Sequence, residues 1–304
     1  MPAFAGMTGK MFTLAHLSDP HLAPLPKPRA AELIGKRITG YINWQRSRRF
    51  IHDSDVLAKI AADLRAQAPD HIAVTGDIAN IALPAEFTRG RDWLQSLGPP
   101  DNVSFVLGNH DIYVSQAAPI AMREWGGFMS GDGGARGFPY LRRRGPLALI
   151  GLSTGVPTAP FLATGRLGER QLGQFSALLE QLRDESVFRV VMIHHPPVSP
   201  RPANKRLVDA AEFLHVIAAH GAELVLHGHD HLHMLNWLAG PNGARVPAVG
   251  VPSASAAPGT SKEAAAYNLY AIDGAPGAWR CEATSRGIDA AGAVMQQRRF
   301  KLLG

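Results

Sequence analysis

The chain has 304 residues, of which 46% are hydrophobic and 18% are charged, and this composition is that of a globular protein with a sizeable core. No window approaches the roughly 18 apolar residues of a membrane span, and the first residues lack the pattern of a secretory signal, so we expect a cytoplasmic protein. Cys281 is the only cysteine, which excludes an intramolecular disulfide and a zinc site built from thiolates. The formal charge of +6 favours an anionic partner without identifying it.

The N-terminal residues 1–10 carry no periodic pattern. We expect them to be disordered, or to precede a true translation start at Met11. Residues 11–304 show no internal repeat and no low-complexity linker, and they therefore predict a single domain.

Next along the chain, residues 25–50 form a basic insertion. Positions 27–49 hold seven lysines and arginines against the single acid Glu32: Lys27, Arg29, Lys36, Arg37, Arg46, Arg48 and Arg49. The spacing predicts a loosely amphipathic helix, although Gly35 and Gly40 lower its helix propensity. Its apolar face would carry Ile34, Ile38 and Tyr41, with Ile42 and Trp44 to its sides. Such a helix either contacts an anionic membrane or packs on the domain as a surface helix, and the sequence leaves both interpretations open.

Six short apolar runs, each ending in a polar tip, predict buried strands. They are FTLAHLSD, HIAVTGD, VSFVLGNHD, LALIGLS, FRVVMIHH and AELVLHGHDH. Amphipathic stretches separate them, most clearly GERQLGQFSALLEQLRDE, whose leucines and Phe175 form a helical stripe. Beyond His233 the pattern changes to strands joined by turns. This order predicts an α/β protein in which two sheets pack on each other with helices outside.

The last of these runs leads into a row of histidines. His227, His229, His231 and His233 alternate, and side chains two apart share one face of an extended chain, which suits metal ligation. An isolated histidine is more often structural, so this interpretation needs partners elsewhere in the chain.

Those partners follow the other predicted strands. The motifs are SDPHL with Asp19 and His21, TGD with Asp77, GNHD with Asn109, His110 and Asp111, and HHPP with His194 and His195. Each motif alone is a weak signal. Together, each at the carboxyl end of a strand, they predict one shared site, because loops at strand ends converge in space.

With the blocks D-x-H, G-D, G-N-H-D, a histidine and G-H-x-H in this order, the sequence resembles the calcineurin-like metallophosphoesterases from Asp19 to His231. In its motifs it is most similar to their class III cyclic-nucleotide and glycerophosphodiester phosphodiesterases. The resemblance implies a four-layer α-β-β-α sandwich, two mixed sheets flanked by helices.

The resemblance also implies two metal ions. Asp19, His21 and His231 would bind one metal, Asn109, His194 and His229 the other, with Asp77 bridging them. The family's ligand is usually the first histidine of HHPP, which favours His194 over His195. His227 and His233 fall outside G-H-x-H and are expected to support the ligands or the fold. Oxygen and nitrogen ligands fit manganese, iron or zinc alike.

The chemistry implied is phosphoester hydrolysis. Two divalent ions about 3.5 to 4 Å apart share a hydroxide that attacks phosphorus. The amide of Asn109 binds a cation without cancelling its charge. His110 resembles the family's catalytic histidine, which contacts the phosphoryl oxygen or protonates the leaving group. Asp111 is expected to orient His110 or its loop.

Several substrates stay open. The leading hypothesis is a cyclic-nucleotide-like phosphodiesterase. A pyrophosphatase for UDP-diacylglucosamine at the inner membrane surface is the alternative, favoured by the basic insertion, although that enzyme has arginine where this chain has His110. A DNA nuclease ranks lower, since no aromatic platform for bases is visible. A non-catalytic scaffold would be expected to lose ligands, and none is missing. We expect the pocket walls to come from residues 25–50, residues 112–140 and the basic tail QQRRFKLLG.

Overall fold

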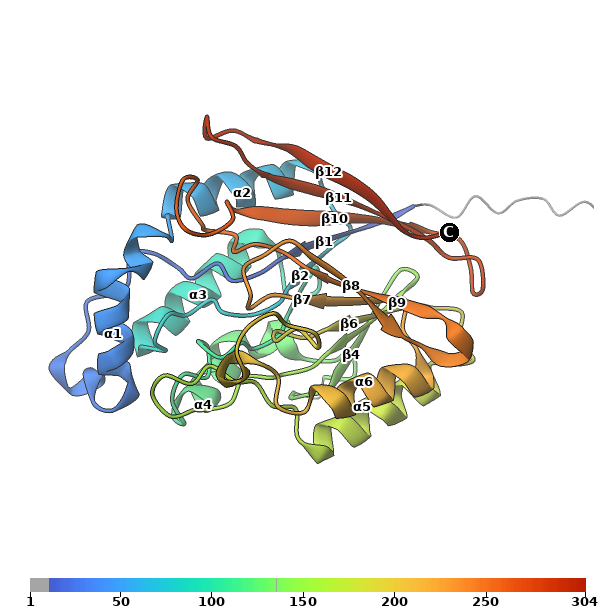
Figure 1. Ribbon diagram of the computed structural model, residues 1–304, viewed down its shortest axis with the longest axis horizontal. Helices are drawn as coiled ribbons and strands as arrows, with labels where there is room; N and C mark the ends of the chain where they lie inside the picture. The colour runs from blue at the N-terminus through green and yellow to red at the C-terminus, as the bar shows by residue number, and fades with distance from the viewer. Residues whose placement is uncertain (1–10, 135) are drawn as a thin grey trace, which may run out of the picture.

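Two six-stranded sheets form the centre of the molecule (Figure 1). The computed structural model describes residues 11–134 and 136–304, so the expectation for residues 1–10 lies outside the described residues. The first sheet has the order β12-β11-β10-β1-β2-β3 and the second β4-β5-β6-β7-β9-β8. The first consists of β1 (Phe12–Leu17), β2 (His71–Val74), β3 (Val103–Phe105), β10 (Ala266–Asp273), β11 (Arg280–Ile288) and β12 (Val294–Leu303). The second consists of β4 (Tyr140–Arg144), β5 (Leu147–Gly151), β6 (Phe188–Met192), β7 (Leu224–His227), β8 (Met234–Ala239) and β9 (Arg245–Gly250).

Both sheets are mixed, with parallel strands at the positions that matter for the site. β1, β2 and β3 run parallel, as do β5, β6, β7 and β9, whereas β10, β11, β12, β4 and β8 pair antiparallel with their neighbours. Parallel neighbours bring their carboxyl ends to one edge of a sheet. The sheet topology therefore places the polar segments close together at this edge, namely those that follow β1, β2, β3, β6 and β7.

Alternate residues of the second sheet face different layers. Leu147 and Leu149 of β5 belong to the core that faces the first sheet, whereas Ala148 and Ile150 belong to a separate cluster with the helices outside. This alternation follows from the period of two in a strand. Because both faces of the second sheet are buried, its strands have apolar residues at successive positions and appear in the sequence as continuous apolar runs.

Helices cover the outer faces. α2 (Ser54–Ala66) packs on β10, β11 and β12, and α5 (Glu169–Gln181) and α6 (Ala210–His220) pack on the second sheet (Figure 1). α3 (Pro84–Leu97) and α4 (Ala117–Trp125) lie beside β3, where Trp125 contacts Phe87 and Phe105. The predicted four-layer sandwich is confirmed, and so is the predicted helix with Phe175 buried. No helix of the described ranges is long and apolar enough to span a bilayer.

The insertion folds as a 3₁₀ turn (Ala30–Leu33), helix α1 (Lys36–Arg46) and a second 3₁₀ turn (Arg48–Phe50). Trp44 is buried and stacks on His52 with ring centroids 6.3 Å apart. Ile38 and Ile42 instead point to solvent. The expected single apolar face of this helix is therefore divided: one side packs on the domain, and the isoleucines lie outside.

The C-terminal segment also differs from expectation. Its residues form β12, an edge strand paired along its length with β11, where the sequence suggested only a basic tail. Its charged side chains are mostly exposed, so it lacks the apolar run by which the buried strands were found.

Candidate metal centre

The loops after five strands are tied together by backbone hydrogen bonds. Asp19 and His21 N–H donate to the carbonyls of Gly76 and Asp77, at 3.0 and 3.1 Å, which joins the loop after β1 to the loop after β2. The two sheets are joined as well, because the N–H of His229 donates to the carboxylate of Asp19 at 2.9 Å. The predicted site residues are thereby held in one place although they are far apart in sequence.

The backbone is strained at these loops. Nine described residues other than glycine have a positive φ, and five of them are predicted ligands: Asp19 (51°), His21 (35°), Asp77 (57°), His229 (68°) and His231 (55°). Such conformations cost on the order of 1 kcal/mol or more each and persist where the surrounding structure enforces them. Their concentration here is typical of a functional site.

Asp19, His21 and His231 form one cluster of ligand atoms, all within 4.8 Å of one another. The Nε2 of His231 lies 3.1 Å from the Asp19 carboxylate, and that of His21 lies 3.9 Å from it. His21 donates through Nδ1 to the carbonyl of Ala79 at 3.1 Å, which leaves Nε2 turned toward the carboxylates.

Asp77 links this cluster to a second one. Its Oδ2 lies 3.9 Å from the Nε2 of His21 and 3.3 Å from the Nε2 of His194. His194 is oriented through Nδ1, which donates to the carbonyl of Thr75 at 2.6 Å. Asp77 therefore reaches both histidines, and Asp19 shares a cluster of ligand atoms with Asp77 and His194.

His229 and Asn109 complete the predicted set. The Nε2 of His229 lies 2.7 Å from the carbonyl of Lys205 and must donate there, so its Nδ1 is the nitrogen left for a ligand. His229 forms a cluster with His194 and His195, in which one ligand atom of each residue lies within 4.8 Å of the others. The amide oxygen of Asn109 is buried with no hydrogen-bond partner among the described residues.

His194 and His195 are distinguished by their contacts. Both nitrogens of His195 have partners, with Nδ1 2.7 Å from the hydroxyl of Thr154 and Nε2 3.2 Å from the carbonyl of Ala163. The Nε2 of His194 has no hydrogen-bond partner in the described part of the chain. These contacts favour His194 as the ligand of the pair.

The electrostatics of the clusters are those of a cation site. Burial alone would raise the pKa of Asp77, but His194 and His110 hold it at about 2. Burial likewise opposes the charge of His194, yet Asp77 and Asp19 raise the pKa of this imidazole to about 10. Without a metal, a proton on His194 supplies the positive charge that the two carboxylates attract, and a bound cation would displace it.

These residues fit two cations. The donors are buried oxygen and imidazole groups, and three of them, His21 Nε2, His194 Nε2 and Asn109 Oδ1, have no hydrogen-bond partner in the described residues. Buried polar atoms are nearly always paired, and the unpaired Nε2 atoms of His21 and His194 both lie near the Asp77 carboxylate, which indicates ligands for metals.

His110 lies beside the clusters. Its backbone N–H donates to Asp77 at 2.7 Å, its Nδ1 donates to the carbonyl of Asn80 at 2.5 Å, and its ring stacks on Tyr113. Burial first, and then the charge of Arg48, lowers the pKa of His110 to about 3. The neutral imidazole is thus favoured, with its Nε2 available as an acceptor.

Asp111 does not contact His110 through its carboxylate. It accepts hydrogen bonds from the backbone N–H groups of Asp77, Ala79 and Gly108, at 2.8, 3.0 and 2.9 Å. These contacts hold the loop after β2 against the loop after β3. Of the two expected roles, they favour orientation of the loop.

Two residues near the site were not singled out from the sequence. Arg48, from the insertion, reaches His110 with Nη1 3.0 Å from the ring nitrogens. His52 lies against His21 with ring centroids 4.5 Å apart and contacts the hydroxyl of Ser255. Neither belongs to a motif: the only signal for Arg48 was the basic character of the insertion, and His52 had none.

His227 and His233 lie outside the clusters of ligand atoms. His227 is buried within β7, and the backbone N–H of His233 donates to Glu263 at 2.7 Å. Their expected role in supporting the fold or the ligands stays a prediction.

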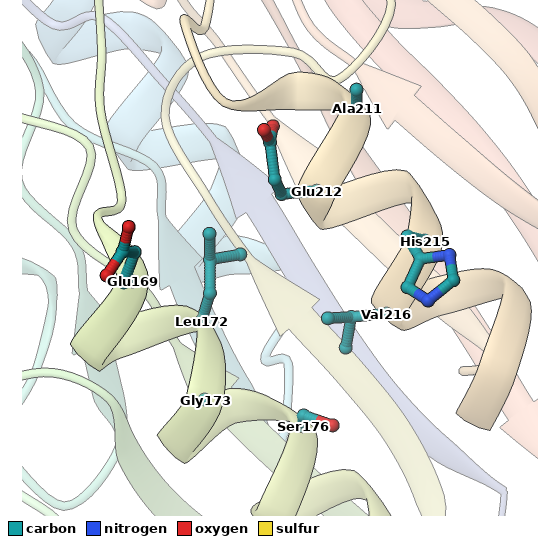
Figure 2. A pocket seen from close by; sticks show the side chains of 8 residues that line it. All are labelled: Glu169, Leu172, Gly173, Ser176, Ala211, Glu212, His215 and Val216. Carbon is teal, nitrogen blue, oxygen red and sulfur yellow. The ribbon is translucent and has the colours of Figure 1, made fainter.

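A groove on the molecule lies away from these residues. It has a volume of about 520 Å³ and lies between α5 and α6, where none of the predicted site residues lines it. Figure 2 shows Leu172 and Val216 facing the space between the helices, while Glu169, Glu212 and His215 do not converge on one point. This groove offers no ligand cluster.

Comparison with known proteins adds to these observations. The family model described as calcineurin-like phosphoesterase matches residues 12–233. A protein from Synechococcus named "Probable cyclic nucleotide phosphodiesterase" is 29% identical over 232 residues, which are 75% of this chain and 76% of that protein.

Solved structures share the fold. A dimetal phosphatase from Danio rerio is 14% identical, with a TM-score of 0.63 over 96% of this chain and 98% of its own. The purple acid phosphatase PPD1 from yellow lupin is 11% identical, with a TM-score of 0.59 over 96% of this chain and 54% of its own.

Proposed function

Because the chain belongs to the calcineurin-like phosphoesterase family and is a hydrolase of phosphoric esters, we propose that it is a phosphodiesterase that acts on cyclic-nucleotide-like substrates with two bound metal ions. The observation that carries this proposal is the position of Asp77 between two clusters of buried donors, at 3.9 Å from His21 and 3.3 Å from His194. The relative named as a cyclic nucleotide phosphodiesterase supports the substrate class.

Each residue has a role in this proposal. Asp19, His21 and His231 hold one cation, Asn109, His194 and His229 hold the other, and Asp77 contacts both. When bound, the two cations, which we propose to be manganese, iron or zinc, supply Lewis acidity and lower the pKa of water. The backbone carbonyls of Ala79, Thr75 and Lys205 fix the histidine tautomers.

His110 is the proposed catalytic residue. Its Nδ1 is committed to the carbonyl of Asn80, so Nε2, which also lies 3.0 Å from Arg48 Nη1, is the nitrogen with which it would act on a substrate or its leaving group. Asp111 positions the loop that carries His110 and Asn109.

The test compares metal content with turnover of 3′,5′-cyclic AMP. Protein loaded with manganese is expected to bind two metals per chain and to hydrolyse the cyclic diester. His110→Ala is expected to lower kcat by roughly 10²- to 10⁴-fold with both metals retained. Loss of metal from His110→Ala would show that it is a ligand, and a wild type that binds no metal would contradict the whole assignment.

A second candidate is a lipid-linked phosphoester at an anionic membrane, such as UDP-diacylglucosamine. The observation in its favour is an outer patch on the insertion, made of Ile34, Ile38 and Ile42, which are 77%, 48% and 42% exposed. Figure 1 shows α1 at one edge of the molecule. The exposed Arg46 and Arg49 follow this patch along the chain, and apolar side chains with nearby basic groups suit an anionic bilayer surface.

Vesicle binding separates the two candidates. If the lipid candidate is right, the protein sediments with phosphatidylglycerol vesicles but not with phosphatidylcholine vesicles, and Ile38→Asp/Ile42→Asp does not bind. Val208→Asp changes an exposed apolar residue outside the insertion and serves as the control. No binding by the wild type, together with a higher kcat/KM for cyclic AMP than for dispersed UDP-2,3-diacylglucosamine, would exclude the lipid candidate.

A further inference from the structure

Arg48 is the first residue of the turn that follows α1, and the backbone fixes its place. The carbonyl of Arg48 accepts hydrogen bonds from the N–H groups of Ile51 and His52, both at 3.0 Å. The next residues are tied to the loop after β9, since Asp53 N–H donates to Ser255 at 2.9 Å. The backbone position from which the Arg48 guanidinium extends is therefore fixed.

The guanidinium of Arg48 contacts the ring of His110. The Nδ1 of His110 must carry a proton, because its partner at 2.5 Å is the carbonyl of Asn80, which only accepts. Arg48 Nη1 lies 3.0 Å from both ring nitrogens, and in the neutral ring only Nε2 can accept a hydrogen bond from it. The ring of His110 is itself 5.0 Å from that of His21, so Arg48 borders the proposed ligands.

Arg48 forms no close ion pair within the described residues, although the charges of Asp77, Glu86 and Asp19 act on it from a greater distance. Its hydrogen bonds there go to His110, and no carboxylate lies within 4 Å of it, although it is only partly exposed. Other sheltered arginines have acceptors: Arg286 binds Asp63, Arg189 binds Glu223, and the buried Arg142 donates to four backbone carbonyls. A sheltered cation without a carboxylate is costly unless a ligand provides the negative charge.

We propose that Arg48 binds a non-bridging oxygen of the substrate phosphate, on the side of the site occupied by His110. This inference rests on the proposed phosphoesterase function and adds to it a residue outside the family's motif blocks. The planar guanidinium has five N–H donors in a fork that matches phosphate, and one of them is used by His110. His110 thereby also orients Arg48 toward the site.

The charge balance of the site indicates which kind of phosphate is attracted most strongly when Arg48 is present. Two divalent cations against the carboxylates of Asp19 and Asp77 leave about two positive charges, and Arg48 adds about one more. A phosphate dianion is matched better by this total than the monoanion of a diester. Arg48 thus strengthens the binding of monoester products and orthophosphate. It also stabilises the additional negative charge that develops on the phosphate during attack on a diester.

The experiment measures binding of orthophosphate to metal-loaded protein by calorimetry at pH 8. Arg48→Met is expected to weaken binding by about 10- to 100-fold, since hydrogen bonds to charged groups are among the strong ones, and to keep two metals per chain. Arg49→Met is the matched control: it removes an exposed arginine at the next position, whose partner is Gln45, and should change the affinity less than about twofold.

Arg48→Lys keeps the positive charge but loses the forked N–H donors of the guanidinium. We therefore expect an affinity for orthophosphate between those of the wild type and Arg48→Met. If Arg48→Met lost metal, Arg48→Lys would decide: full metal content with weaker phosphate binding supports the proposal, and metal loss in both variants overturns it. Unchanged phosphate affinity in fully loaded Arg48→Met also overturns it. Failure of the proposed function is distinct, because it would appear in the wild type as absent metal or absent turnover.

Discussion

The carboxylate of Asp111 accepts a hydrogen bond from the backbone N–H of Asp77 at 2.8 Å, across 34 positions of sequence. Gly108, directly before Asn109, donates to the same oxygen at 2.9 Å. One buried carboxylate therefore fixes the spacing between the loop of Asp77 and the loop of Asn109 and His110.

Asp111→Asn should loosen both loops, because an amide cannot accept all three backbone hydrogen bonds. We expect the free energy of unfolding to fall by about 2 to 3 kcal/mol and metal content to fall with it. Urea denaturation and elemental analysis measure the two effects.

Asp209→Asn is the control, since Asp209 also accepts hydrogen bonds from two backbone N–H groups, those of Leu167 and Gly168, outside the ligand clusters. It should lose stability and keep both metals. Equal metal content in both variants would show that Asp111 does not position the site.

Asp77→Ala removes the carboxylate that contacts both clusters and the acceptor of the His110 N–H. We expect affinity for both metals to fall and turnover of cyclic AMP to be abolished. Full activity in this variant, measured at saturating manganese, would remove the assignment of Asp77 as the shared ligand.

His194→Ala and His195→Ala form a matched pair of neighbours. The first removes an imidazole with a free Nε2 and should cost one metal per chain. The second removes the ring contact with the Ala163 carbonyl and one of the two contacts of the Thr154 hydroxyl, so it should cost about 1 to 2 kcal/mol of stability and no metal. Metal loss confined to His195→Ala would reverse the assignment.

Asp63 predicts a pH dependence of stability away from the site. Burial alone would raise the pKa of this carboxyl, but hydrogen bonds from Arg286 and Tyr267 hold it below its usual value. A lowered folded pKa means that the stabilisation is complete above the unfolded pKa of about 3.9 and is lost as the pH falls through the folded pKa.

The effect should amount to about 1 kcal/mol, because the pair is partly exposed. Urea unfolding of metal-free wild type and Asp63→Asn between pH 3 and 7 measures it. The two proteins should differ in stability at pH 7 and converge toward pH 3; a constant difference would contradict the prediction.

The chain order of the motifs was enough to place the site at the strand ends. Apolar runs and their polar tips are local signals, and parallel pairing brings tips together whatever the detailed packing. The alternate histidines were similarly visible, although both His229 and His231 adopt a positive φ, which simple alternation in an extended strand does not predict.

The edge strand β12 was not visible in the sequence. An exposed edge strand needs no apolar run, because its hydrogen bonds to β11 are formed by the backbone. The division of α1 into a packed side and an exposed side was equally hidden, since Trp44 and Ile42 are both apolar and only contact with His52 distinguishes them.

The sequence by itself determined the two-sheet architecture and the side chains that meet near Asp77, because periodicity and strand-end motifs act locally. Only the tertiary structure decided that Arg48 meets His110, that Asp111 binds two loops and that His195 is occupied by Thr154 and Ala163. These contacts join residues distant in sequence, and their partners are largely backbone groups, which every residue type carries and which therefore leave no pattern to read.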